Sequence, residues 1–171
     1  EHNSTFTQVD CRDYMLQVGA NNTYSCKYFR EANGTDTATF TITEKQVNNT
    51  NVICEERKGG ATWNGTEYYY SIDDGKMLWL GGTNPQGERF WLNPSSVFGF
   101  KSMTIGKTWR QHYTTNWGYK NYNFLRILDY KFAGFVDVQV PAGTFQDCIK
   151  ILKTTNNSLR IQYYAKGVGL V

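Results

Sequence analysis

Six asparagines in this chain stand in the Asn-x-Ser/Thr triplet, whose side-chain amide accepts N-linked oligosaccharide. They are Asn3, Asn21, Asn33, Asn48, Asn64 and Asn156. The fifteen Asn of the chain would give roughly two such triplets by chance. All but the first lie in polar stretches between apolar ones, where a glycan would extend into water. The pattern predicts a secreted or cell-surface protein with covalent N-glycans, the alternative being Asn- and Thr-rich loops that carry no sugar.

The second set of reactive side chains is four cysteines, namely Cys11, Cys26, Cys54 and Cys148. An even number of cysteines in an extracellular chain predicts two disulfides, for which three pairings are possible. The alternative is that some of them are free thiols packed as small apolar residues. No two are spaced as CxxC, and only His2 and His112 are available to join them, so we expect neither a zinc site nor any other cofactor.

The sequence contains none of the GxSxG, HExxH, Walker A or GxGxxG motifs of catalytic and nucleotide-binding sites. The acidic pair at 73–74 precedes Gly75 and is typical of a turn. Glu55 and Glu56 are adjacent in an extended segment, so their side chains are expected on opposite faces. His112 has no Ser, Cys or carboxylate motif nearby that would make it a general base. We therefore expect a protein that is not an enzyme.

Aromatic residues make up 16% of the chain and offer rings on which sugars can stack. The alternative is that most of them pack in the core. Trp79 and Trp91 lie in apolar segments and are expected to be buried. Trp117 lies between two polar loops, which makes it the best candidate for an exposed glycan platform.

The elements that must position these residues have the alternating pattern of antiparallel strands. In residues 36–47, threonines at alternate positions share one face, while Phe40 and Ile42 share the other. About ten such short segments follow one another with turn residues between most of them, and no helical period is convincing. The sequence predicts an all-β fold, either an antiparallel barrel or a strongly curved sheet. A short helical turn near 94–100 and a break near Gly134 are the expected irregularities.

Length and charge narrow the class of protein further. A chain of 171 residues fits a single domain, which we assign to 11–171, with residues 1–10 as an N-terminal arm. The net charge is only +3, and the sequence contains no run of Lys or Arg. Both observations argue against nucleic acid as a partner. No apolar run approaches the 18 residues of a membrane span. The chain is expected to be a processed product that begins at Glu1.

Two segments near the C-terminus, VQVPAGTFQDCIK at 138–150 and YYAKGVGLV at 163–171, form a recognisable pattern. They resemble a broad group of secreted prokaryotic all-β domains of unassigned function, whose typical pattern is VxVPAGTFxxCxxV followed by YYAxGVGLV. The pieces at 16–19 and 103–109 resemble the LxVGxxW elements of that group. The resemblance implies an exported all-β module without assigned catalytic residues, and it adds no chemistry.

In that group the last motif continues into a further strand, whereas this sequence stops at Val171. An unpaired sheet edge readily accepts a foreign strand. The arm 1–10, with Phe6 and Val9 as its apolar residues, is long enough to fill such an edge in a neighbouring copy. Exchange of this kind does not close on itself and builds filaments.

Two functions from different classes are consistent with these features. The first is an extracellular, N-glycosylated structural subunit that assembles with copies of itself, as a surface filament if each copy donates a strand. The second is a secreted binding module that holds a glycan or an apolar ligand in a curved sheet or barrel mouth.

Overall fold

The computed structural model describes residues 8–27, 35–59, 64–117, 120–155 and 158–171. Within these ranges the protein is almost entirely antiparallel strand. The elements are β1 (Gln8–Val9), the 3-10 helix η1 (Cys11–Asp13), β2 (Asn21–Lys27), β3 (Thr35–Val47), β4 (Thr50–Gly59), β5 (Thr66–Asp73), β6 (Lys76–Thr83), β7 (Arg89–Phe100), β8 (Met103–Thr104), β9 (Thr108–Trp117), β10 (Lys120–Val140), β11 (Gly143–Thr155), β12 (Ser158–Ala165) and β13 (Gly169–Leu170). The prediction of an all-β fold is confirmed.

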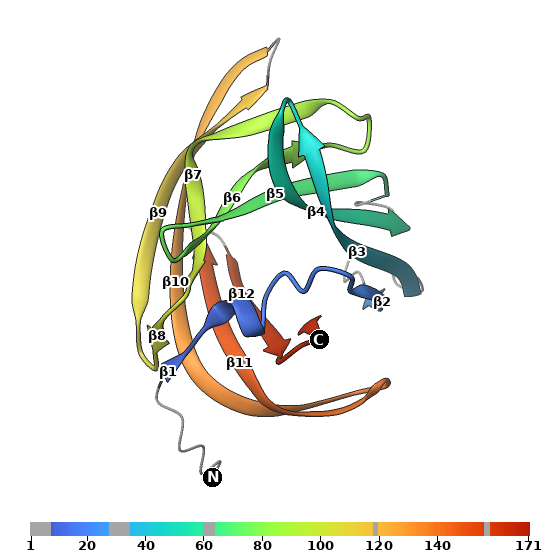
Figure 1. Ribbon diagram of the computed structural model, residues 1–171, viewed down its shortest axis with the longest axis vertical. Helices are drawn as coiled ribbons and strands as arrows, with labels where there is room; N and C mark the ends of the chain where they lie inside the picture. The colour runs from blue at the N-terminus through green and yellow to red at the C-terminus, as the bar shows by residue number, and fades with distance from the viewer. Residues whose placement is uncertain (1–7, 28–34, 60–63, 118–119, 156–157) are drawn as a thin grey trace.

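Eleven of these strands form one sheet in the order β13-β12-β11-β10-β9-β7-β6-β5-β4-β3-β2, while β1 pairs with β8. The sheet curls strongly, so that β9, β10 and β11 face β3, β4 and β5 across the interior (Figure 1). The edge strands β2 and β13 approach each other without pairing. The Asn22 side chain bridges them by donating a hydrogen bond of 3.0 Å to the carbonyl of Val168. The protein is therefore a strongly curved sheet and not a closed barrel, which decides between the two predicted architectures.

Tight turns at the predicted positions set the register of two hairpins. Asn48 and Asn49 have φ of 49° and 62° between β3 and β4, and Asp74 and Gly75 have 44° and 68° between β5 and β6. Two successive positive φ values are characteristic of the type I′ turn, whose twist matches that of the flanking strands. In β3 the predicted alternation is confirmed, because Phe40 and Ile42 are buried while the neighbouring threonines are not.

Three local predictions are wrong. The strands are not all short, since β10 runs for 21 residues without the expected break. Gly134 forms a β-bulge there, with φ of 116° and a register shift against β11, which bends the strand without ending it. Residues 94–100 are strand, not a helical turn. The pairing of β7 with β6 is irregular around Pro94, so its missing N–H removes no bond from that ladder.

The side chains of the sheet pack on two faces. The larger cluster lies inside the curl and includes Met77, Phe132, Ile149 and Ile151, all at most 1% exposed. The chain between β1 and β2 crosses this inner face and adds buried Met15 to it (Figure 1). A smaller cluster of Val47, Val52, Cys54 and Tyr69 lies on the opposite face of β3, β4 and β5. The sheet thus has an inner face that is only partly filled by apolar packing.

Candidate functional site

The inner face of the curled sheet contains two adjoining cavities. The larger one, of about 200 Å³, is bounded by strands from both sides of the curl, and the smaller one, of about 90 Å³, lies toward the two sheet edges. We call them together the interior cavity. Six aromatic side chains line the larger part, namely Tyr68, Tyr70, Trp79, Phe98, Tyr130 and Tyr164. Its cationic lining residues are Arg57, Lys153 and Arg160.

One wall of the interior cavity is a row of side chains that crosses four neighbouring strands. Trp109 on β9 is opposite Tyr130 on β10, Tyr130 is opposite Lys153 on β11, and Lys153 is opposite Arg160 on β12. The rings of Trp109 and Tyr130 stack with an interplanar angle of 3° and centroids 5.1 Å apart. The Lys153 ammonium lies 5.5 Å from the centre of the Tyr130 ring. The register of the sheet therefore places two cations side by side at the end of an aromatic row.

The opposite wall presents Arg57 from β4. Its guanidinium lies between two rings, 4.5 Å from the centroid of Phe40 and 4.2 Å from that of Tyr68. Glu55 accepts from it at 2.5–2.6 Å. Because Arg57 and Glu55 are two residues apart on one strand, both side chains point into the cavity. Arg57 is thus a fixed cation whose charge is balanced within its own strand.

Lys153 has no such balance. Burial lowers its pKa to about 8, and repulsion from Arg160 and then Arg57 contributes to the shift. Glu55 is the one carboxylate among the described residues that line the interior cavity, and it is already bound to Arg57. No carboxylate within the described ranges forms an ion pair with Lys153. The cavity therefore carries excess positive charge beside aromatic surface.

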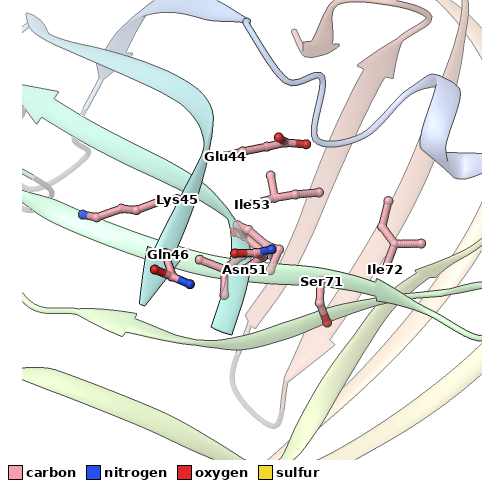
Figure 2. Close-up of a pocket in the computed structure, with 9 residues that line it drawn as sticks. Glu44, Lys45, Gln46, Asn51, Ile53, Ser71 and Ile72 are labelled. Atoms are coloured by element: carbon pink, nitrogen blue, oxygen red, sulfur yellow. The ribbon is translucent and has the colours of Figure 1, made fainter. Parts of the chain in front are cut away.

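An outer hollow of about 460 Å³ lies beside the end of the β3–β4 hairpin (Figure 2). It opens where β4 and β5 separate, since their pairing ends at Ile53 and Tyr70. Glu44, Ile53 and Ile72 extend into the space beside the end of the β3–β4 hairpin (Figure 2). Tyr70 lines this outer hollow and both parts of the interior cavity. Its side chain therefore borders both the outer hollow and the interior cavity.

Three of the six predicted glycan acceptors lie within the described residues, and all three are exposed. The side-chain oxygen of Asn48 accepts from Arg89 at 3.0 Å, that of Asn64 accepts from the backbone N–H of Gly59 at 3.0 Å, and that of Asn21 accepts from Thr41 at 3.2 Å. In each case the oxygen is engaged and the nitrogen, to which sugar would attach, makes no hydrogen bond to a described residue. Asn3, Asn33 and Asn156 lie outside the described residues.

The cysteines do not form the predicted pairs in this structure. Cys11, Cys54 and Cys148 are free and buried. Cys11 packs in the inner cluster and Cys54 in the smaller one, while the thiol of Cys148 donates to the carbonyl of Phe145 at 3.5 Å. Cys26 is opposite Asp36 and Cys54 is opposite Thr43 on their common neighbour β3, an offset of seven residues. At about 3.3 Å per residue this is roughly 23 Å, far more than the Cα separation of any disulfide. One of the three possible pairings is thereby excluded for this fold.

The remaining candidates are dispersed. Val9 is 7% exposed and pairs with Met103, so this part of the predicted donor arm packs in its own domain, while Phe6 lies outside the described residues. The side chain of Trp117 is also outside them. His112 is exposed on β9. The described residues contain no cluster of His, Cys, Asp and Glu suited to a metal ion, and no helix long and apolar enough to span a membrane.

Trp79 and Trp91 lie on opposite faces of the sheet. Both are half-buried, whereas the sequence predicted that both would be buried. Trp79 packs against the inner cluster and lines the interior cavity, whereas Trp91 packs against the smaller cluster. The side chains that matter most in the interior cavity, Arg57 and Lys153, were missed by sequence analysis. A signal for Lys153 was present, because it is in phase with the apolar Ile149 and Ile151 of the same strand.

Comparison with protein-family models, curated proteins and solved structures finds no match for this chain. The resemblance of its C-terminal motifs to secreted prokaryotic domains therefore stays a prediction. In the structure those motifs form the β10–β11 turn and the β12–β13 edge, and Tyr164 from the second motif lines the interior cavity.

Proposed function

We propose that this protein is an extracellular, N-glycosylated binding module that holds a small, largely apolar ligand inside its curled sheet. The observation that carries the proposal is the interior cavity, with six aromatic rings around about 200 Å³ of space. Side chains in a structural core normally interlock and leave few voids larger than a water molecule. Aromatic rings beside fixed polar and charged groups are typical of ligand sites.

The size of the cavity limits the ligand. A buried water needs about 10–15 Å³ measured in the same way, so the two parts together accommodate roughly 20 non-hydrogen atoms. Gln162 lines both parts and offers an amide that can orient a polar substituent. The ligand is thus of the size of a short fatty acid or a substituted bicyclic ring, and smaller than an oligosaccharide.

The exposed acceptor asparagines support the extracellular part of the proposal. Asn48 and Asn64 lie at or beside the β3–β4 and β4–β5 connections and line neither part of the interior cavity. Glycans there would solubilise the module without obstructing the ligand. Enzymatic removal of glycans from native protein is expected to lower its mass stepwise and to leave ligand affinity unchanged. Native protein without bound sugar would contradict this part of the proposal.

The neutral fluorescent probe phenylnaphthylamine tests the binding function. We expect one probe to bind per chain and to raise the melting temperature with the logarithm of the free probe concentration once this exceeds the Kd. Gln162→Trp fills the cavity and should abolish binding. Ile161→Trp places the same side chain on the exposed outer face of the same strand and should leave binding intact. Urea unfolding midpoints of both variants show whether each has folded. Failure of the probe to bind wild-type protein, or equal binding by the two folded variants, would refute the interior site.

Self-association is a second candidate, supported by the two edge strands β2 and β13, each of which has a single neighbour in the sheet. Donation of the arm would first require β1 to leave β8 and Val9 to leave the core. Light scattering of concentrated native protein tests it directly, and a monomer at all concentrations would exclude assembly.

A further inference from the structure

The interior cavity combines two features that a purely apolar ligand does not need. Lys153 and Arg160 are directly opposite each other on β11 and β12, and both line the larger part of the cavity. Two like charges at opposite positions of adjacent strands destabilise a sheet. Neither side chain has a carboxylate partner among the described residues. The protein itself therefore does not supply the negative charge that this pair requires.

A third cation faces the pair from across the cavity. Arg57 lines the same space and contributes to the electrostatic repulsion that Lys153 experiences. Glu55 offsets the charge of Arg57 and holds its guanidinium between Phe40 and Tyr68. The three cations thus surround one region of space, with a net charge near two when Glu55 is included.

The walls next to these cations are aromatic. Trp79 lies 5.7 Å from Tyr68 and 5.7 Å from Tyr113, measured between ring centroids, which forms a continuous ring surface beside Arg57. Phe98 extends this surface and packs 5.1 Å from Tyr70, which also borders the outer hollow. The cavity therefore offers aromatic surface to the body of a ligand, with positive charge beside it.

We propose that the ligand is an amphipathic anion, in which a carboxylate, sulfate or sulfonate group binds between Lys153 and Arg160 opposite Arg57 while an apolar body lies against Tyr68, Trp79 and Phe98. This assignment rests on the binding function proposed above and specifies its ligand class. Arg160 is exposed and Lys153 half-buried, so the anionic group lies at the open side of the cavity. Charge-assisted hydrogen bonds are about twice as strong as neutral ones, so this group contributes strongly to affinity. The aromatic walls accept any apolar body of suitable size and leave the choice of head group to the cations.

Two probes with the same aromatic body separate this inference from the binding function itself. Anilinonaphthalenesulfonate carries an anionic sulfonate, and phenylnaphthylamine is its neutral counterpart. At neutral pH and low salt we expect wild-type protein to bind the anionic probe about tenfold more tightly or better, the discrimination given by one charge-assisted hydrogen bond of 1.5–3 kcal/mol. Lauric acid should displace both probes, and dodecanol should displace them about tenfold less effectively.

Lys153→Met tests the position of the anion. This variant should lose about tenfold in affinity for the anionic probe and keep its affinity for the neutral probe within about twofold, because Met retains the apolar stem and removes the charge. Lys153→Arg should restore most of the lost affinity. Lys131→Met is the matched control, since Lys131 lies on the neighbouring β10 and is exposed. It removes the same charge from the protein and should change neither affinity.

The outcomes distinguish the two proposals. If both probes bind inside the cavity with equal affinity and Lys153→Met changes neither, the ligand class is refuted and the binding module stands. If Lys131→Met and Lys153→Met lower the affinity for the anionic probe equally, the probe responds to the overall charge of the protein. The anion site at Lys153 is then refuted. If neither probe binds wild-type protein, the binding function itself is refuted.

Discussion

Replacement of Lys153 by Met should stabilise the free protein at neutral pH, although it removes a charged residue that contacts an aromatic ring. Burial and the neighbouring Arg160 and Arg57 lower the Lys153 pKa from 10.5 to about 8, so its charged form is disfavoured in the folded state. Each pKa unit corresponds to 1.36 kcal/mol, so the difference between 10.5 and about 8 gives an upper bound of about 3 kcal/mol. Lys153 is partly exposed, and solvent screening reduces the expected gain to about 2 kcal/mol.

The pH dependence of this gain has a definite sign. Between pH 8 and 10.5 the unfolded chain keeps the Lys153 proton while the folded protein has released it, so the stability of wild-type protein rises with pH in this window. The advantage of Lys153→Met should therefore be full below pH 8 and should vanish toward pH 10.5. The other ionisable groups that line the same cavity are Arg57 with its partner Glu55, Arg160, and the tyrosines Tyr68, Tyr70, Tyr130 and Tyr164. Burial raises the Tyr130 pKa well above its usual value, so that residue stays neutral across the window.

Urea unfolding at pH 7 and pH 10, without added anions, measures this prediction. At pH 7 we expect a higher midpoint with an unchanged slope, or a melting temperature raised by about 4–8 °C for a chain of this length. Lys131→Met, on the exposed surface of β10, should change stability by less than about 0.5 kcal/mol. The reasoning fails if Lys153→Met is less stable than wild-type protein at pH 7, or if its advantage is the same at both pH values.

Three further predictions concern the scaffold. A Cβ added at Gly82 would lie 2.1 Å from the backbone oxygen of Glu67, so Gly82→Ala must separate β5 from β6 and should lower the free energy of unfolding by more than about 2 kcal/mol in urea titrations. Burial raises the thiol pKa to about 12 for Cys11 and about 11 for Cys54, so iodoacetamide at pH 8 should leave both unmodified in native protein and alkylate both after denaturation; absence of labelling after denaturation would indicate disulfides. Val9→Ala removes two buried carbons from the core and should lower stability by about 2 kcal/mol in the same titrations, whereas an arm free to donate its strand would show no loss.

Local chemistry was sufficient to predict most strands and their turns. The alternation in residues 36–47 and the Asn48-Asn49 turn are properties of neighbouring residues, and both are found in β3 and the β3–β4 hairpin. Residues 94–100 were predicted differently because Pro94 normally ends a strand. In the structure an irregularity in the β6–β7 ladder accommodates Pro94, and the strand continues to Phe100. Whether Pro94 is tolerated in a strand depends on the pairing with the neighbouring strand, and the sequence of residues 94–100 alone does not specify that pairing.

The interior cavity was harder to predict than the strands, because it depends on which faces meet when the sheet curls. Along β4, Val52 and Cys54 are buried on one face of the sheet, and Arg57 lies on the opposite face. Alternation alone would place Arg57 in water. The curvature that brings β4 opposite β11, and hence Arg57 close to Lys153, arises from bulges and twist distributed over many strands. No pattern within a single segment specifies that distance.

The same curvature explains why a cavity remains. A sheet that closed into a barrel through β2 and β13 would require its inner side chains to fit a fixed circumference. Here the two edges are linked by the hydrogen bond from Asn22 to Val168 without backbone pairing. The inner side chains are therefore not required to pack against one another across the whole interior. The three cations further oppose collapse, because contact between Lys153, Arg160 and Arg57 would bring like charges together. A bound anion would reverse this effect by attracting all three, so the ligand proposed here is also the component that would complete the core.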